Sequence, residues 1–549
     1  MREILLVIVC ALFFTAVVSF GQDEPLANED KEGLYARSIE QVLRLEDEEV
    51  DLATAVLIVS EQWSDVVAGR RYLTDLDDMA FEIRSRLKGK GLQANYKAVA
   101  VINEYLFDEL GFESIPDAND PNDLFLHSVM DRKRGYCLSL SILYLSLGER
   151  LGLPLYGVVV PGHFFVRYDD GVVRFNIETT SKGGYADDEH YINKFKVPPL
   201  GDALLRLGTP SGGRKDDNSI YMANLSKIQT LGCFFNNLGN SYNEIGDAEQ
   251  ALLALERAVE INSSLAESRV NLGNIYLNKD RIEDAIYEYE AALEISPSNA
   301  KAHNNLGNAY TKRGWFNDAI SQYMQSIELD PNFTEAYKSL ANVYCKRGMF
   351  GQAQSALKQA IISEPENANC YSQLGDVYNQ MGKYEEAIFQ YKRALKIKGD
   401  FAGAHYGLAL CYNKLGLVDD EIRAYQKALA IEPDMLAALA NLGNAYFEKQ
   451  NYDAAIEEYR KAIQIKPNDG SIRYNLGAAY SNKGDYEQAV AEYRKAVEIE
   501  PEMGDAYNGL AFAFYKLGRY DLAWHHIKVA EKLGVEISKE LLAAIEDEL

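Results

Sequence analysis

Leucine returns every 34 residues through the second half of the chain, and the other apolar positions keep a constant register around it. The nine copies begin at about residue 232 and contain no insertion. Their leucines are Leu238, Leu272, Leu306, Leu340, Leu374, Leu408, Leu442, Leu476 and Leu510. A fixed period of this length indicates a repeat architecture in which each copy is one supersecondary unit.

Within each copy the apolar spacing predicts two helices joined by a short turn. A small residue follows the leucine, as at Gly239 and Gly273, and allows two helices to approach closely. Most turns contain a glycine, which ends a helix in the left-handed conformation. Asp280 and Gln450 replace this glycine, and Glu421 replaces an alanine that the other copies carry in the second helix. We expect these departures to bend or loosen the array locally without ending it.

A single helix pair cannot bury its apolar face, so stacked pairs are expected to share one continuous core and wind into a superhelix. The pattern assigns residues 232–535 to nine repeats and residues 536–549 to a capping helix that is polar on one side. This half of the chain is therefore predicted to be an α-solenoid.

The first half has a different pattern. Residues 35–110 show the apolar spacing of amphipathic helices, and a further helix is predicted from Cys137 to Gly152. Two strands follow at residues 163–168 and 173–178, joined by a turn at Asp170-Gly171. Taking these two residues as the centre of a two-residue turn places His163 opposite Glu178, with Cβ atoms about 5 Å apart. The same register pairs Phe164 with Ile177, Val166 with Phe175, Tyr168 with Val173, and Arg167 with Arg174 near the exposed turn.

Composition fits two or more soluble folded units. The 549 residues are 47% apolar and 25% charged, and the formal net charge is -26. No stretch forms the basic stripe that a phosphate backbone requires, so nucleic acid is excluded as a partner. The same sign of charge disfavours anionic lipid surfaces.

The N-terminus reads as a secretory signal over residues 1–21. Arg2 precedes an apolar run over residues 5–20, and Ser19 and Gly21 fit a cleavage site that leaves Gln22 as the mature N-terminus. An exported protein, periplasmic or extracellular and without a stable membrane span after cleavage, is therefore expected. The alternative is an uncleaved N-terminal anchor.

Residues 22–208 then form the N-terminal domain, and residues 209–231 form a linker and first helix, with a flexible composition at 210–214.

Cysteine spacing argues against a disulfide framework or a metal site. The five cysteines after the signal are Cys137, Cys233, Cys345, Cys370 and Cys411, an odd number without any CxxC pair. Four of them fall inside the repeats, where cysteine is usually a small buried hydrophobe. We expect neither a metal nor another cofactor.

Cys137 stands apart because it lies at the start of a predicted helix, where unpaired N–H groups and the helix dipole favour a thiolate. With His163 as a base and Glu178 to orient its ring, the three residues form the nucleophile, base and orienter of cysteine hydrolases and acyltransferases. Taken singly, a buried thiol and a structural histidine are the better explanations of the first two residues. His127 and His190 are interpreted as surface residues, and Asn103 either belongs to the site or caps a helix.

Both halves resemble known families. Copies such as NLGNAYFEKQNYDAAIEEYRKAIQIKPND resemble the tetratricopeptide repeat, a module that binds other proteins. Cys137 followed by PGHFFVRY and IETT resembles the transglutaminase-like superfamily, with SirB-type proteins similar through VDLATAVLIV and VINEYLFDELGF. The resemblance implies a mainly α chain, in which an α+β transglutaminase-like (papain-like) domain precedes an α-solenoid, and it places a triad on Cys137, His163 and Glu178. The family usually has Asp-Pro at the third position, where this chain has Glu178-Thr179.

Asparagine recurs at two positions of the first helix of the repeats, three residues apart and hence on one face. The family resemblance implies that this face lines the concave groove. The residues are Asn237, Asn271, Asn305, Asn441 and Asn475 at one position, and Asn240, Asn274, Asn308, Asn342 and Asn444 at the other. Such a ladder is similar to that of O-linked N-acetylglucosamine transferases and could hold an extended peptide backbone. Alternatively, the amides bond to neighbouring repeats and stabilise the stack.

The sequence favours a scaffold for protein–protein interaction, with a protein or peptide in the concave groove and a transglutaminase-like domain that retains a candidate triad. The alternative is an active cysteine-dependent amide hydrolase or acyl transferase whose substrate the repeats recruit.

Overall fold

The computed structural model describes residues 35–64, 69–116, 120–195 and 221–548. The predicted signal peptide and the linker at 210–214 lie outside these ranges. The chain divides into two compact units, residues 1–309 and 310–549, each of which is described by itself. Among the described residues, no helix combines the length and the hydropathy of a membrane span.

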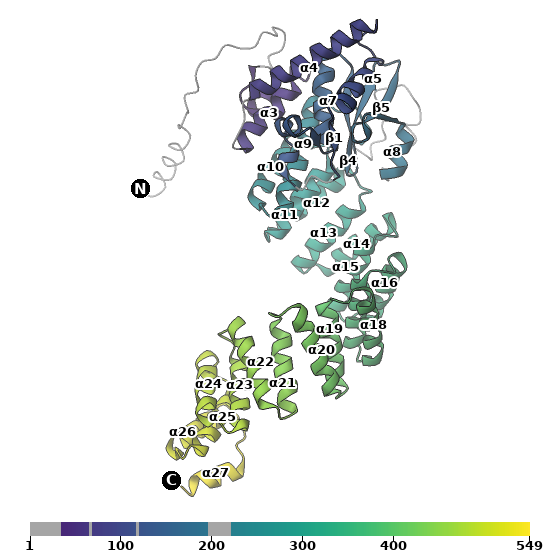
Figure 1. Cartoon of the computed structure of the whole chain (residues 1–549). Coiled ribbons are helices and arrows are strands. Elements are labelled where there is room, and N and C mark those ends of the chain that lie inside the picture. Colours follow the sequence, from purple (N-terminus) through teal and green to yellow (C-terminus); the bar gives the residue numbers. More distant parts are fainter. Residues whose placement is uncertain (1–34, 65–68, 117–119, 196–220, 549) are drawn as a thin grey trace, which may run out of the picture. The chain divides into compact units, whose positions relative to one another are not determined.

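The N-terminal part of the first unit combines helices with a small sheet (Figure 1). Its helices are α2 (Ile39–Val42), α3 (Leu52–Trp63), α4 (Gly69–Gly89), α5 (Ala98–Asn103), the π-helix η2 (Glu104–Glu109), the 3-10 helix η3 (Pro121–Asp123), α6 (Leu126–Arg132), α7 (Cys137–Leu151), the 3-10 helix η4 (Thr179–Ser181) and α8 (Asp188–Phe195). Helix α7 is the central element and packs against α3, α4, β3 and β4. It ends at Gly152 in the left-handed conformation (φ 69°), which confirms the predicted helix.

The sheet has four antiparallel strands in the order β3 (Leu155–Val160), β4 (His163–Asp169), β5 (Arg174–Glu178) and β6 (Gly184–Ala186). The strands β4 and β5 confirm the two predicted ones, whereas β3 and β6 were not predicted. A separate parallel pair joins β1 (Glu113–Ser114) to β2 (Arg134–Gly135). The domain is thus of the predicted α+β class.

The predicted register of the β4–β5 hairpin is wrong by two residues. Val166 lies opposite Ile177, Tyr168 opposite Phe175, Arg167 opposite Asn176 and Asp169 opposite Arg174. The turn is a longer loop over residues 170–173, closed by the Asp170 carboxylate, which accepts from the N–H groups of Val172 at 2.9 Å and Val173 at 2.7 Å. Because the shift is an even number of residues, every side chain keeps its predicted face of the sheet.

The first repeats belong to the same unit as this domain. They comprise α9 (Lys227–Glu244), α10 (Ala248–Ile261), α11 (Ala266–Asn278) and α12 (Ile282–Ile295), and α13 (Ala300–Arg313) begins in this unit. One buried hydrophobic core extends from Ile39 of the domain to Leu265 at the start of α11. The first helix pair therefore buries apolar surface against the N-terminal domain.

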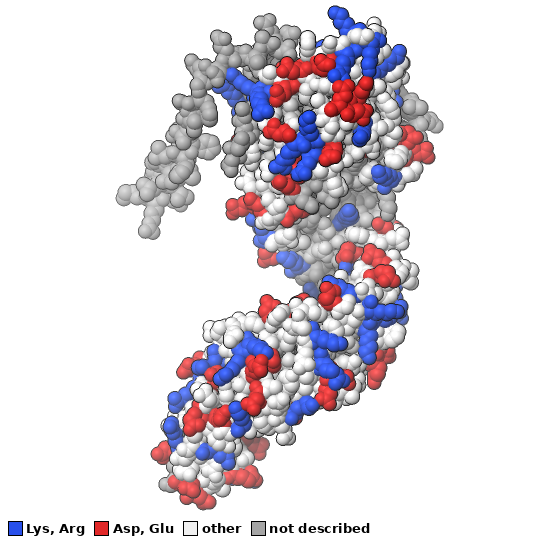
Figure 2. Space-filling model, viewed as in Figure 1, with Lys and Arg blue, Asp and Glu red and all other residues white. Residues whose placement is uncertain are grey.

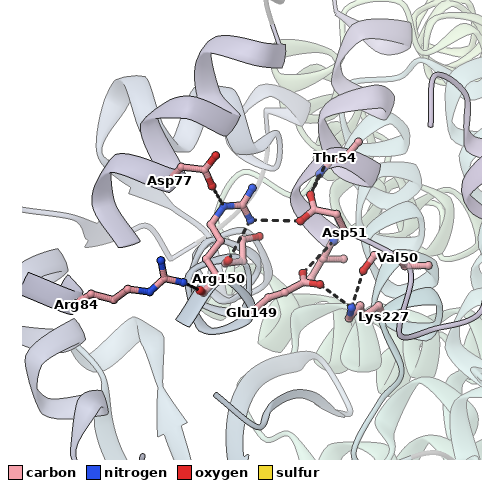
Figure 3. Close-up of polar contacts among 10 residues, drawn as sticks. Val50, Asp51, Thr54, Asp77, Arg84, Glu149, Arg150 and Lys227 are labelled. Carbon is pink, nitrogen blue, oxygen red and sulfur yellow. Dashed lines mark hydrogen bonds and ion pairs between the residues drawn. The ribbon is translucent and has the colours of Figure 1, made fainter. Parts of the chain in front are cut away.

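Polar contacts also tie the start of α9 to the domain (Figure 3). The Lys227 ammonium pairs with Glu149 Oε1 at 2.6 Å. The neighbouring Arg150 contacts Asp77 at 2.7 Å and Asp51 at 3.4 Å. The side chains of Arg150 and Asp51 are only 7% and 6% exposed, so losing either partner would leave the other charge buried.

The second unit consists of helix pairs at the predicted spacing. Its helices are α14 (Phe316–Leu329), α15 (Thr334–Lys346), α16 (Phe350–Ser363), α17 (Ala368–Gln380), α18 (Tyr384–Ile397), α19 (Ala402–Lys414), α20 (Val418–Ile431), α21 (Leu436–Glu448), α22 (Tyr452–Ile465), α23 (Gly470–Lys483), α24 (Tyr486–Ile499), α25 (Gly504–Lys516), α26 (Tyr520–Lys532) and α27 (Lys539–Glu546). Gly375 shows why a small residue follows the leucine, since a Cβ added there would lie 2.7 Å from the Tyr391 ring. The repeats therefore form the predicted solenoid of helix pairs.

The turns without glycine keep the glycine conformation. Asp280 and Gln450 both have φ 61°, close to the 72° of the turn residue Gly382. A left-handed side-chain residue costs roughly 1–2 kcal/mol, which the packing of the flanking helices offsets. On the face shown in Figure 2, basic and acidic side chains are interspersed, and no single basic patch covers either unit.

Candidate active site

Cys137 is the first residue of α7 and is only 3% exposed. Three hydrogen bonds fix this helix start. The Ser139 hydroxyl accepts from the N–H of Tyr136 at 2.9 Å and donates to the carbonyl of Asp123 at 3.0 Å. The Thr179 hydroxyl, at the start of η4, donates to the Cys137 carbonyl at 3.4 Å. The thiol is therefore held where the helix dipole is positive.

His163 and Glu178 meet across the β4–β5 pair. His163 Nε2 donates to Glu178 Oε2 at 2.7 Å. In the observed register they are diagonal neighbours, two residues out of direct opposition, at a distance that only a long side chain bridges. The extra methylene of glutamate, relative to the aspartate usual in the family, provides that reach.

The charges of the site reinforce one another. Burial by itself lowers the pKa of His163, but hydrogen bonds and charge interactions with Cys137 and Glu178 outweigh it and raise this pKa to about 9. Burial likewise raises the pKa of Glu178, yet the bonds from His163 and Thr180 lower it to about 2. At neutral pH the pair is an imidazolium and a carboxylate.

His163 Nε2 is bound to Glu178, and Cys137 lies near enough to the ring to raise the pKa of His163. The structure brings together all three residues that the sequence selected. A nucleophile, a base and an orienting carboxylate are the parts needed for acyl transfer at a thiol.

Three further residues of the site were missed. Thr180 donates to Glu178 Oε1 from its N–H at 3.1 Å and its hydroxyl at 2.6 Å. Tyr191 of α8 donates to Glu178 Oε2 at 3.0 Å, and the Phe195 ring stacks on His163 with centroids 4.8 Å apart and planes 2° apart. Tyr191 and Phe195 are four residues apart, hence on one helix face, and this spacing was the available signal.

Arg167 holds α8 over the site. The prediction of an exposed Arg167 opposite Arg174 is wrong, because Arg167 is fully buried and pairs with Asn176. Its guanidinium donates to Asn176 Oδ1, Asp188 Oδ1 and the carbonyl of Met222, each at 2.7 Å. Asp188 is the first residue of α8, so this network anchors the helix that carries Tyr191 and Phe195.

The remaining polar candidates lie away from the reacting atoms. Asn103 donates to the carbonyl of Gly183 at 2.9 Å and accepts from Tyr144 at 2.8 Å, which braces the segment after β5. His127 stacks on the Phe125 ring at 5.7 Å, and His190 is exposed. In the ranges that the structure describes, no cluster of His, Cys, Asp or Glu could hold a metal ion.

The asparagine ladder makes contacts within and between repeats. At the first ladder position, the amides of Asn271, Asn305, Asn441 and Asn475 donate to Asn236, Asn274, Tyr406 and Asn444 of the preceding repeat, and Asn237 accepts from Asn236. At the second position, Asn240 and Asn308 are partly buried and Asn342 is exposed. The first position thus contributes to stacking, which leaves the second position as the one that can serve a ligand.

A tyrosine of the second helix fixes the amide at the second position. Tyr289 donates to Asn274 Oδ1 at 2.7 Å, and Tyr459 donates to Asn444 Oδ1 at 2.6 Å. Each oxygen also accepts the amide from the next repeat, so both of its lone pairs are used. Among the described residues no partner contacts Nδ2 of Asn274 or Asn444, so these side chains offer N–H donors.

Both halves of the chain match models of known protein families. Residues 70–197 match the model of the transglutaminase-like superfamily. Models of the TPR repeat and the tetratricopeptide repeat match a series of segments between residues 239 and 518. These matches fit the elements that carry the triad and the helix pairs.

Among curated proteins, a UPF0162 protein of Xylella fastidiosa is 32% identical over 161 residues, which are 29% of this chain and 55% of the relative. A UPF0162 protein of Pseudomonas aeruginosa is 25% identical over 34% of this chain and 64% of its own. F-box only protein 21 of Mus musculus is 33% identical over 15% of this chain and 13% of its own. The chain spans about half the length of the first of these relatives.

Two solved structures are similar to parts of the chain. The crystal structure of MamA is 29% identical over 31% of this chain and 94% of its own, with a TM-score of 0.29. The structure of YrrB, described as a TPR protein with an unusual peptide-binding site, is 25% identical over 35% of this chain and 96% of its own, also with a TM-score of 0.29.

Proposed function

We propose that this chain, which contains a transglutaminase-like domain at residues 70–197 followed by tetratricopeptide repeats at residues 239–518, binds a partner polypeptide in its repeats and transfers acyl groups through Cys137. Repeats of this kind support protein–protein interaction. The observation that carries the catalytic part is the His163 ring, which donates to Glu178 at 2.7 Å and whose pKa is raised by Cys137 as well as by Glu178. The concave groove is the proposed binding surface.

The chemistry runs through a thioester. The Cys137 sulfur attacks the carbonyl carbon of an amide and forms a C–S bond, and the C–N bond breaks as the leaving amine takes a proton from His163. Water or a second amine then attacks the thioester and gives its proton to His163 as the thiolate leaves. Glu178 holds the ring throughout, and its low pKa of about 2 keeps it ionised. The products are an acid with water, or a new amide with an amine.

An acylation experiment tests this activity without knowledge of the natural substrate. p-Nitrophenyl acetate supplied to the full chain should release a burst of about one nitrophenolate per chain and leave an acetyl thioester on Cys137. Added glycinamide should remove the acetyl group. Cys137→Ser and His163→Ala should abolish the burst, whereas Cys345→Ser, which changes a repeat cysteine, should retain it. An undiminished burst in Cys137→Ser would rule out the proposed nucleophile.

A second candidate is a scaffold in which both halves only bind. It is favoured by the burial of Cys137, which is 3% exposed, and by the Phe195 ring that covers His163. The two candidates differ in the reactivity of one thiol.

Export is a separate part of the proposal and rests on residues 1–21. N-terminal sequencing of the mature protein should begin at Gln22. A protein that retains Met1 and fractionates with membranes would support the alternative, an uncleaved anchor.

A further inference from the structure

One repeat carries a hydrogen-bond acceptor at the second ladder position, where other repeats carry the amide donor of an asparagine. At the position of Asn274 and Asn444, the fifth repeat carries Asp376, and Tyr391 donates to its Oδ1 at 2.6 Å, as the equivalent tyrosines do to the asparagines. The geometry of the step is therefore retained. A carboxylate has no N–H, however, so its free atom Oδ2 is an acceptor where the asparagines present a donor.

Asp376 is exposed and borders a cavity of about 440 Å³ among α15, α17 and α19 of the second unit. The rings of Phe401 and Tyr406 line the same cavity. Lys338 also lines it, but its ammonium pairs with Glu335 at 2.6 Å, which compensates its charge. In the part of the chain that the structure describes, the Tyr391 hydroxyl donates to Asp376, and no cation pairs with the Asp376 carboxylate.

These features together specify a planar cation. A carboxylate oxygen accepts hydrogen bonds from a guanidinium, and aromatic faces attract its charge and its flat surface. Ammonium groups lack the plane that stacks on a ring. The net charge of -26 on the whole chain adds a long-range attraction for a basic ligand.

We propose that the cavity beside Asp376 binds the arginine side chain of an extended partner peptide, whose backbone carbonyls accept from ladder amides of the same unit such as Asn444. This inference rests on the proposed function of the groove and names the chemistry of its partner. Ladder positions that carry an asparagine donate to backbone carbonyl oxygens whatever the peptide sequence. The position that carries Asp376 accepts instead, and therefore selects one side chain. The array thereby gains a fixed register for its partner.

The expected discrimination is about tenfold in Kd between arginine and its uncharged isostere citrulline, since a charge-assisted hydrogen bond in a partly exposed site is worth about one power of ten. The effect should shrink as salt is raised, because the cavity is open to solvent.

Fluorescence anisotropy on the full chain tests the inference with two labelled twelve-residue peptides of Gly, Ser and Ala, one with a central arginine and one with citrulline. The arginine peptide should bind the wild type about tenfold more tightly. Asp376→Asn, which restores the residue found at the equivalent positions of other repeats, should abolish the difference while the citrulline peptide binds as before. Asp453→Asn removes the same charge from an exposed site on α22 and should leave the difference intact.

Equal affinity of both peptides for the wild type, or an equal loss in Asp453→Asn, would overturn the arginine subsite while leaving peptide binding in place. Failure of both peptides to bind the wild type would instead count against the proposed function of the groove, and the subsite would fall with it. Displacement of the peptide by an equimolar amount of N-acetyl-argininamide would show a small-molecule site and overturn the peptide assignment.

Discussion

Shortening Glu178 by one methylene tests the geometry of the triad. The pKa of His163 is about 9 against an ordinary value of 6.5, a preference for the protonated ring of about 3 kcal/mol that Cys137 and Glu178 share against the opposing effect of burial. Glu178→Asp cannot span the diagonal offset, so the 2.7 Å contact should be lost. We expect the variant to lower the pKa of His163 by at least one, which corresponds to about 1.4 kcal/mol.

Glu178→Gln is the matched control for side-chain length, since it keeps the length of the glutamate side chain and removes its charge. It should also lower the pKa of His163 while keeping the ring in place. The assay is a pH titration of the His163 Cε1–H signal in protein labelled with 13C-histidine, assigned through His163→Gln. The sign follows from linkage: the folded pKa of His163 lies above the unfolded one and that of Glu178 lies below it. The pair therefore stabilises the chain fully between about pH 4.5 and 6.5, and this contribution is lost as the pH rises through about 9 or falls through about 2.

A His163 pKa that stays near 9 in both variants would refute the reasoning, because the carboxylate would then not be what holds the proton. An unchanged value in Glu178→Asp alone would show that aspartate reaches the ring and that the diagonal register does not require glutamate.

Three further outcomes concern the rest of the molecule. Arg167→Met should destabilise the chain by about 2–4 kcal/mol in urea unfolding, because its buried acceptors lose their donor, while an unchanged midpoint would show that α8 is held by other contacts. Glu421→Ala should stabilise by about 1–3 kcal/mol, since it removes a carboxyl that is 2% exposed. Burial raises the pKa of Glu421, so the gain should grow as the pH rises above about 4.5, and a gain independent of pH would contradict this cause. Asn444→Asp keeps the oxygen that accepts from Tyr459 but removes the amide donor, so it should weaken peptide binding with little change in melting temperature; the reverse result would show a purely structural ladder.

The sequence predicted the elements of the site better than their pairing. Periodicity was sufficient for the repeats, because the leucine, the small residue and the turn each report a local packing requirement. The helix start at Cys137 was equally local. The hairpin register was not, since it depends on whether Asp170 closes a two-residue or a longer turn, and its carboxylate selects the longer one by accepting from two backbone N–H groups.

Burial imposed by distant segments was beyond sequence reasoning. Arg167 was expected near an exposed turn, but α8 and the segment around Met222 fold over it and supply its acceptors. The Phe195 ring that stacks on His163 also belongs to α8. Such contacts join residues that share no sequence period, so no pattern along the chain reports them.

Rates of thiol labelling test the central claim most directly. Burial raises the pKa of the repeat thiols, to about 12 at Cys233, about 11 at Cys370 and about 12 at Cys411, whereas Cys345 is only half-buried. Exposure alone would make Cys345 react first, because Cys137 is 3% exposed. Iodoacetamide at neutral pH, with peptide mapping by mass spectrometry, should nevertheless label Cys137 fastest, and His163→Ala should remove that advantage. Faster labelling of Cys345 than of Cys137, or a rate at Cys137 unchanged in His163→Ala, would contradict an activated nucleophile.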